Sequence, residues 1–310
     1  MSAEARIWKL AKGKPGYPRS LLDLQDDAPA QLFGCGNEGL VRALEPGRAV
    51  TIVGSRHASA YGLHVAERLG GLLAAAGLVI VSGMARGIDA AAHRGALGAG
   101  GVTLAVLGGG ADVVYPARAR RLYGEILHAG AGVSEAPPGR RPESWSFPVR
   151  NRIMAALGAI TVVVEAAQPS GSLITARRAL ELGREVGAVP GPVTSRVSQG
   201  TNDLIADGAV PVRGAQDILD RLLGVGARGA SRHGPALEPA LARVLEAVEL
   251  GRASGDAVAN AAGVAAGEAA IGLARLELLG YLRVDADGRY SRTDLLAPED
   301  ARRPATTLDA

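Results

Sequence analysis

The segment 78–93 constrains the fold most, because an apolar strand runs directly into a glycine-bearing turn and then into a helix. Gly83 and Gly87 allow a ligand to approach the main chain closely, and the first N–H groups of a helix attract anions. A second segment of the same design begins with the apolar residues 49–53 and continues through the turn Gly54-Ser55-Arg56. Two such turns, each with an arginine, predict a partner that carries phosphate.

Residues 50–224 alternate short β-branched runs with helical stretches, which predicts an α/β fold with a doubly wound, mostly parallel sheet. Strands are expected at about 49–53, 78–81, 102–107, 131–134, 160–165, 186–189 and 209–212. Ligands of such sheets bind beyond the carboxyl ends of the strands. The glycine turns at 54, 83, 108–110 and 171 are therefore expected to converge on one crevice.

The flanking segments have different compositions. We expect residues 1–49 to form a short N-terminal extension, and residues 225–236, rich in Gly, Ser and Pro, to form a linker. Residues 237–297 have the order of a winged helix, three short helices followed by a hairpin, and residues 298–310 have the composition of a flexible tail.

Composition excludes several classes of protein. No apolar run reaches the roughly 18 residues that a membrane span needs, and the first residues lack the apolar segment of a secretory signal. A single cysteine, Cys35, excludes an internal disulfide and a cysteine-based zinc cluster. We therefore expect a cytoplasmic protein without a membrane partner, a metal or a cofactor.

Enzyme motifs are sparse. The run Gly54–Gly62 does not match the dinucleotide fingerprint, and no P-loop occurs. Asp89 and His93 lie four residues apart on an expected helix, where they could form an acid–base pair. Alternatively, the Asp89 carboxylate lies near the helix start, where the helix dipole favours it, and forms a hydrogen bond with a partly buried His93. Because no serine lies in a nucleophile elbow, we expect a binding protein and not an enzyme.

The segment 139–152 is the most cationic part of the chain, with four arginines against one glutamate, and it also holds Trp145 and Phe147. Guanidinium groups bind phosphate and aromatic faces stack on unpaired bases, so this pattern suits single-stranded nucleic acid. The alternative is that the two aromatic residues anchor an irregular loop in the core. Arg150 and Arg152, at the start of an expected helix, are predicted phosphate contacts.

The loop 165–177 repeats the turn design once more. Ser170 or Ser172 can cap the following helix, and Gly171 fits a tight turn. The loop would add hydroxyl and amide donors to the crevice, although ordinary N-capping explains the serines equally well.

Taken together, these motifs resemble the DprA (Smf) family of bacterial DNA-processing proteins. The resemblance spans about residues 50–215 and rests on six motifs in order: Gly54-Ser55-Arg56; Ser82–Asp89 with His93; Leu107–Gly110 with Tyr115-Pro116; Phe147–Ile153; Ser170–Ala176; and Pro190-Gly191-Pro192 with Gly200-Thr201-Asn202. It implies an extended Rossmann-like domain that binds single-stranded DNA, forms a homodimer, and loads the RecA recombinase onto incoming strands during natural transformation.

The resemblance also implies the residues of a positively charged DNA pocket. With the donors of the third loop, the predicted site comprises Arg56, Ser82, Gly83, Gly87, Arg150, Asn151, Arg152, Ser170, Gly171 and Arg177. Many family members carry a helical, sterile-alpha-motif-like domain ahead of the sheet. Since only 49 residues precede the sheet here, we expect that domain to be missing or vestigial.

A winged helix also occurs in many family members. The expected reading helix, residues 265–279, offers only Arg275 against Glu268 and Glu277, and residues 225–310 carry 10 basic and 12 acidic groups, a net charge of −2. Duplex binding needs phosphate neutralisation. We therefore interpret this part as a protein-interaction or packing module.

Two other functions remain open. Nucleoside-monophosphate hydrolases share such glycine turns, and here Asp89 and His93 would be acid and base, with Glu165 as the carboxylate near the ribose. A scaffold for partner proteins would bind no nucleic acid. For self-association, Leu219, Leu222 and Leu223 form one candidate face, the alternative being that they pack their helix on the core.

Overall fold

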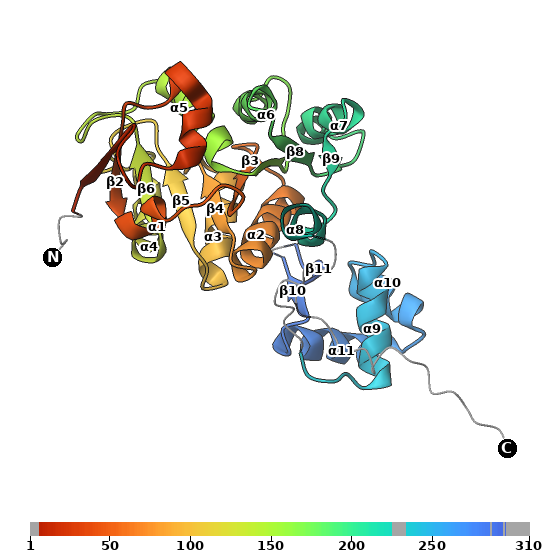
Figure 1. The fold of residues 1–310 in the computed structure, drawn as a ribbon. Helices are drawn as coiled ribbons and strands as arrows, with labels where there is room; N and C mark the ends of the chain where they lie inside the picture. The colour runs from red at the N-terminus through yellow and green to blue at the C-terminus, as the bar shows by residue number, and fades with distance from the viewer. Residues whose placement is uncertain (1–5, 225–233, 286, 294, 296–310) are drawn as a thin grey trace. The chain divides into compact units, whose positions relative to one another are not determined.

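The computed structural model of the chain describes residues 6–224, 234–285, 287–293 and 295. It divides into two compact units, Met1–Gly229 and Ala230–Ala310, which are described separately below (Figure 1).

The first unit is built on a nine-stranded sheet with the strand order β1-β2-β6-β5-β4-β3-β7-β8-β9. Neighbouring strands from β6 to β9 in this order are parallel, while β2 pairs antiparallel with both β1 and β6. This confirms the predicted α/β fold with a mostly parallel sheet. The strands are β1 Trp8–Ala11, β2 Gln31–Gly36, β3 Ala49–Val53, β4 Val79–Ser82, β5 Thr103–Val106, β6 Ala131–Ser134, β7 Ile160–Val163, β8 Glu185–Ala188 and β9 Val210–Pro211.

Helices cover both faces of this sheet. Side chains alternate along each strand, so in β4 Val79 and Val81 join one apolar cluster and Ile80 joins the other. The first cluster includes apolar residues of α5 and α6, and the second those of α2, α3 and α8 (Figure 1). The helical segments are η1 Arg19–Asp27, α1 Glu38–Arg42, α2 Ala60–Ala75, α3 Ile88–Gly98, η2 Ala117–Ala119, α4 Arg120–Ala129, α5 Ser146–Leu157, α6 Gly171–Glu181, η3 Arg196–Ser198, α7 Gln199–Ala206 and α8 Ala215–Leu223.

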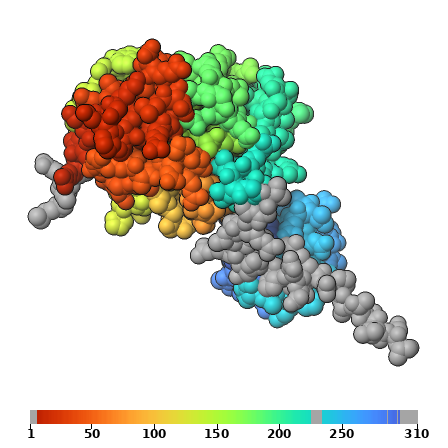
Figure 2. Space-filling view, viewed as in Figure 1, coloured from red at the N-terminus to blue at the C-terminus, as the bar shows by residue number. Residues whose placement is uncertain are grey.

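In place of the extension predicted for residues 1–49, the N-terminal segment adds two strands to the same sheet (Figure 1). In the space-filling view, the red atoms of this segment pack directly against the rest of the first unit (Figure 2). Trp8 of β1 lies directly over Gly34 of β2, where a Cβ atom would come within 2.2 Å of the indole ring. The indole Nε1 of Trp8 also donates a hydrogen bond to the carbonyl oxygen of Gly36, at 3.0 Å. Gly34, one of the two glycines that make residues 31–36 a poor strand by sequence, therefore allows the tryptophan to cover this strand.

The described residues of the second unit form three helices, α9 Pro239–Glu249, α10 Gly255–Ala262 and α11 Ala266–Leu278. An antiparallel hairpin of β10 Leu282–Val284 and β11 Tyr290–Arg292 follows them. Apolar side chains of all three helices and of the hairpin form one small core. The predicted order of elements is present, and the winged-helix assignment stays a prediction. Residues 225–233 of the predicted linker and the whole predicted tail, 298–310, lie outside the described residues.

Within the described residues, no single helix has the length and apolar character of a membrane span, and only α10 and α11 together, bent by 105°, pass that test. Nor do the described side chains place three or more His, Cys, Asp or Glu residues where they could hold a metal ion.

Candidate nucleic-acid interface

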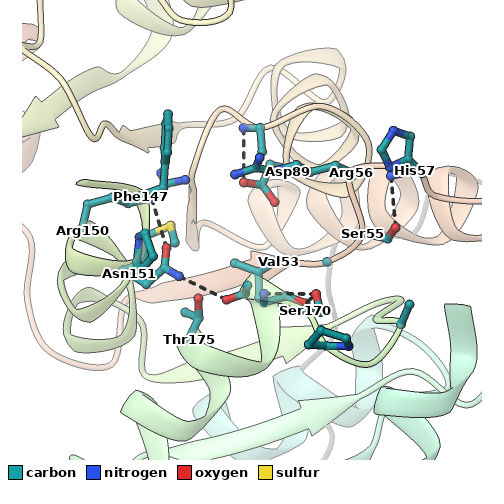
Figure 3. Close-up of a pocket in the computed structure, with 18 of the residues that line it drawn as sticks. Val53, Ser55, Arg56, His57, Asp89, Phe147, Arg150, Asn151, Ser170 and Thr175 are labelled. Carbon is teal, nitrogen blue, oxygen red and sulfur yellow. Dashed lines mark hydrogen bonds between the residues drawn. The ribbon is translucent and has the colours of Figure 1, made fainter. Parts of the chain in front are cut away.

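A pocket of about 720 Å³ opens at the carboxyl ends of β3, β4 and β7 (Figure 3). The turn after β3, the start of α5 and the start of α6 surround it. Of the four glycine turns expected to converge here, those at Gly54 and Gly171 place a glycine in the lining, whereas Gly83 and residues 108–110 are not part of it. Its lining comprises Val53, Gly54, Ser55, Arg56, His57, Ala85, Asp89, Tyr115, Pro142, Ser144, Phe147, Pro148, Arg150, Asn151, Met154, Ala167, Pro169, Ser170, Gly171, Ser172 and Thr175.

The turn after β4 is held through both backbone polar groups of one residue, Gly83. The N–H of Gly83 donates to Oδ2 of Asp89 at 3.1 Å, and its carbonyl oxygen accepts a hydrogen bond from Nη1 of Arg150 at 2.8 Å. A Cβ atom on Gly83 would lie 2.3 Å from the guanidinium nitrogens, so glycine is needed here. Gly83 was predicted as a binding residue, but its N–H is already used by Asp89.

Gly87 joins the two glycine turns. It has a φ of +77°, and a Cβ atom there would lie 2.2 Å from the carbonyl oxygen of Ser55. The same oxygen accepts a hydrogen bond from the N–H of Ile88 at 3.2 Å, at the start of α3. The turn after β3 therefore covers the N-terminus of α3. Gly87 serves this close backbone approach and does not line the pocket.

Arg150 and Asn151 connect α5 to the turn after β4 and to α6. Arg150 is only 5% exposed, and its Nη1 donates to the carbonyl oxygens of Gly83 and Val106. Its Nε donates to Oδ1 of Asn151 at 3.1 Å, and Nδ2 of Asn151 donates to the carbonyl oxygen of Gly171 at 3.1 Å. Burial lowers the pKa of Arg150 to about 10, opposed by the nearby Asp89 carboxylate, so the side chain stays charged at neutral pH.

Aromatic and cationic side chains gather at the mouth of the pocket. The guanidinium carbon of the exposed Arg56 lies 5.5 Å from the centre of the Phe147 ring. The Tyr115 ring, 55% exposed, lies 5.6 Å from Phe147 at an angle of 37°. Phe147 is thus a half-buried member of the pocket wall. Tyr115 was not among the predicted site residues, although Tyr115-Pro116 belongs to one of the six motifs that carry the family resemblance.

Trp145 lies next to the pocket lining without belonging to it. It is 50% exposed, so the alternative interpretation as a core anchor is wrong for this side chain. Its Nε1 donates to Oε2 of Glu143 at 2.8 Å, and the guanidinium carbon of Arg140 lies 5.2 Å from the ring centre.

Only part of the predicted site lines this pocket. Arg152 instead forms an ion pair with Glu135, with 2.6 Å between Nη2 and Oε2, and donates to the carbonyl oxygen of Asp27 at 2.9 Å. Ser82 is buried and donates its hydroxyl to the carbonyl oxygen of Ile52 at 2.6 Å. The pocket brings together Arg56, Arg150, Asn151, Ser170 and Gly171, whereas Ser82, Gly83, Gly87, Arg152 and the exposed Arg177 are not part of its lining.

The acid–base pair considered from the sequence does not form. Nδ1 of His93 lies 2.7 Å from Oγ1 of Thr103, which itself donates to the carbonyl oxygen of Ile80, so the imidazole is the donor. Burial lowers the pKa of His93 to about 3, which keeps the ring neutral. Among the described hydrogen bonds none joins His93 to Asp89, whose Oδ2 accepts from the N–H groups of Gly83 and Ala85.

Glu165 is also engaged elsewhere. Its two carboxylate oxygens accept hydrogen bonds from the backbone N–H and the hydroxyl of Ser59, at 2.9 and 2.6 Å. It therefore holds the start of α2 and is not available as a carboxylate for a ribose in the pocket.

The family model for DNA recombination-mediator protein A matches residues 9–223. The chain belongs to this family. A putative DNA processing protein DprA of Mycobacterium tuberculosis (strain H37Rv) is 43% identical over 277 residues, which cover 85% of this chain and 71% of that protein. Protein Smf of Escherichia coli (strain K12) is 46% identical over 211 residues, covering 66% of this chain and 54% of that protein.

Two solved structures of the family have the same fold. The X-ray structure of DprA from Streptococcus pneumoniae is 42% identical with a TM-score of 0.64, over 69% of this chain and 74% of that one. DprA from Helicobacter pylori, whose structure describes a unique single-stranded DNA binding mode, is 29% identical with a TM-score of 0.63, over 72% of this chain and 98% of that one.

The family match extends over the whole sheet of the first unit. It begins in β1 and ends in the last residue of α8. The two N-terminal strands, which the sequence alone assigned to an extension, are thus part of the segment that matches the family.

Proposed function

We propose that the pocket binds the backbone of single-stranded DNA without sequence preference, and that the protein presents the bound strand to the RecA recombinase. The observation that supports this most is the guanidinium of Arg56 over the Phe147 ring at the pocket mouth, beside the buried cation of Arg150. Guanidinium groups neutralise phosphates and aromatic rings stack on any base. The single-stranded DNA binding mode described for the Helicobacter pylori relative supports the same substrate class.

The polar groups of the pocket favour backbone binding over base reading. Most hydrogen bonds of the buried polar side chains are made with the protein's own main chain, as for Arg150, Asn151 and Asp89. Sequence readout needs side chains that reach base edges in pairs of hydrogen bonds. The binding chemistry also requires neither a metal nor a nucleotide cofactor, because backbone donors and arginines supply the positive charge.

Fluorescence anisotropy with a labelled oligo-dT, in the absence of metal, tests the proposal. Affinity is expected to fall with salt with a logarithmic slope near −0.7 per phosphate neutralised. Duplex DNA of the same length should bind more weakly, because the phosphates of a paired backbone cannot follow a narrow crevice. Equal affinity for the two forms would contradict this geometry.

Delivery to RecA and self-association are further parts of the proposal. If the strand is delivered, RecA should hydrolyse ATP sooner on protein-coated oligo-dT at limiting RecA concentration than on naked oligo-dT. Light scattering is expected to give the mass of a homodimer. Of the face considered from the sequence, Leu219 is buried in the core and Leu222 packs against it, so only Leu223 remains exposed for a partner.

The second unit is proposed to bind a protein and not duplex DNA. Arg275, the one cation expected on the reading helix, pairs with Glu238, with 3.2 Å between Nη2 and Oε1. Glu268 and Glu277 on the same helix are exposed. A fragment of residues 235–298, once circular dichroism shows it to be folded, is therefore expected not to shift duplex DNA at moderate salt. A clear shift would show that the unit is a duplex reader.

A further inference from the structure

Two buried threonine hydroxyls of the first unit, those of Thr161 and Thr175, have no hydrogen-bond partner within the described chain. Thr161 lies in β7 and is not part of the pocket lining. Thr175 lies on α6, is only 1% exposed, and lines the pocket. Buried polar groups nearly always have a hydrogen-bond partner. An unpaired hydroxyl at a pocket wall therefore indicates that a ligand entering the pocket supplies that partner.

The reason that Thr175 has no partner lies four residues earlier. A threonine within a helix commonly donates to the carbonyl oxygen of residue i−4, which here is Gly171. That oxygen instead accepts a hydrogen bond from Nδ2 of Asn151 at 3.1 Å. In Figure 3 the hydroxyl oxygen of Thr175 points into the space between the side chains of Asn151 and Ser170.

The N-terminus of α6 lies at the same wall. Its N-cap, Ser170, accepts a hydrogen bond from the N–H of Ser172 at 3.3 Å, and the two hydroxyl oxygens are 2.7 Å apart. Apart from the two flanking residues and the backbone of the helix itself, no atom comes within 4 Å of the position that a Cβ atom on Gly171 would take, so the first turn of the helix is open above this residue. An eleven-residue helix presents the positive end of its dipole there.

The charges at this end of the pocket come from Arg150 and Asp89. Nη2 of Arg150 makes no hydrogen bond with the described residues, whereas Nη1 and Nε are used by the protein. The Asp89 carboxylate would repel an anion, but Oδ2 accepts two backbone N–H groups, and the guanidinium of Arg150 is near it. The other polar groups here, which are the Thr175 hydroxyl, the N-terminus of α6 and Nη2 of Arg150, can donate hydrogen bonds to the oxygens of a phosphate.

We propose that the buried wall of the pocket is a subsite for one phosphate group of the bound strand, held by the Thr175 hydroxyl, the N-terminus of α6 and Nη2 of Arg150. This rests on the proposed function and adds Thr175 to the binding residues. The exposed side chains at the mouth, Arg56 and Tyr115, contact the strand where it leaves the pocket.

Thr175→Val removes the hydroxyl while keeping the shape of the side chain. Oligo-dT affinity is expected to fall about tenfold, as for the loss of a hydrogen bond to a charged group. The salt slope should stay unchanged, because threonine carries no charge. Thr161→Val, which removes the other unpartnered hydroxyl, is the matched control and should bind within about twofold of the parent. Thr175→Ser keeps the hydroxyl and should restore binding; if the valine variant fails to fold, Thr175→Ala replaces it.

Calorimetry with thymidine monophosphate separates failure of the subsite from failure of strand binding. If Thr175→Val binds oligo-dT as tightly as the parent, the subsite is overturned and strand binding stands. If the parent does not bind oligo-dT, the proposed function is contradicted, and the binding of thymidine monophosphate then tests the subsite by itself. Binding by the parent and by Thr161→Val, but about tenfold weaker by Thr175→Val, then supports the subsite. Equal binding by all three proteins, or none, overturns it.

Discussion

Arg150→Ala is expected to lower the free energy of unfolding by about 3–5 kcal/mol, the range for removing one member of a buried charged network. The guanidinium satisfies the carbonyl oxygens of Gly83 and Val106 and the amide of Asn151. Alanine would leave these acceptors unpaired, and it would leave the Asp89 carboxylate buried without its neighbouring cation. Urea unfolding followed by circular dichroism measures the effect.

Arg56→Ala is the matched control for that experiment. Arg56 is an exposed arginine of the same pocket, and its replacement should change the free energy of unfolding by no more than about 0.5 kcal/mol. Parental stability of Arg150→Ala would show that the clamp on Gly83 contributes nothing. Because we expect the opposite, a loss of DNA binding in Arg150→Ala reports the collapse of the turn after β4 as well as the loss of a phosphate contact.

The sheet was predictable because its central strands are short β-branched runs buried on both faces. All seven strands expected from the sequence are present, from Ala49–Val53 to Val210–Pro211. The two N-terminal strands were not predicted, since β2 contains two glycines and its burial depends on Trp8, more than twenty residues away. A tertiary contact of this kind leaves no local pattern.

The site was predictable at the level of loops but not of single residues. Arg150 and Arg152 lie two positions apart on α5, which places their side chains about 200° apart around the helix axis. One therefore reaches the turn after β4 and the other reaches Glu135. Helical periodicity alone is enough to predict that these two side chains point in different directions. The engagement of the Gly83 N–H by Asp89 was not, because it depends on the conformation of the turn between them.

Removal of the Arg56 and Phe147 side chains is expected to have the largest effect on DNA binding. Arg56→Ala should weaken oligo-dT binding by about 1–3 kcal/mol and bring the salt slope about 0.7 closer to zero, as for one lost phosphate contact. Phe147→Ala should cost about 1–3 kcal/mol through lost base stacking and leave the salt slope unchanged. Anisotropy titrations of both variants at several salt concentrations measure these two signatures separately.

The double variant then tests whether the two side chains act as one unit. The guanidinium of Arg56 lies over the Phe147 ring, so each side chain positions the other, and the double variant is expected to lose less than the sum of the single losses. Arg177→Ala is the control, because Arg177 is exposed on α6 and outside the pocket lining. If Arg177→Ala weakened binding as much as Arg56→Ala, the strand would run over α6, and the mouth formed by Arg56 and Phe147 would not be its entrance.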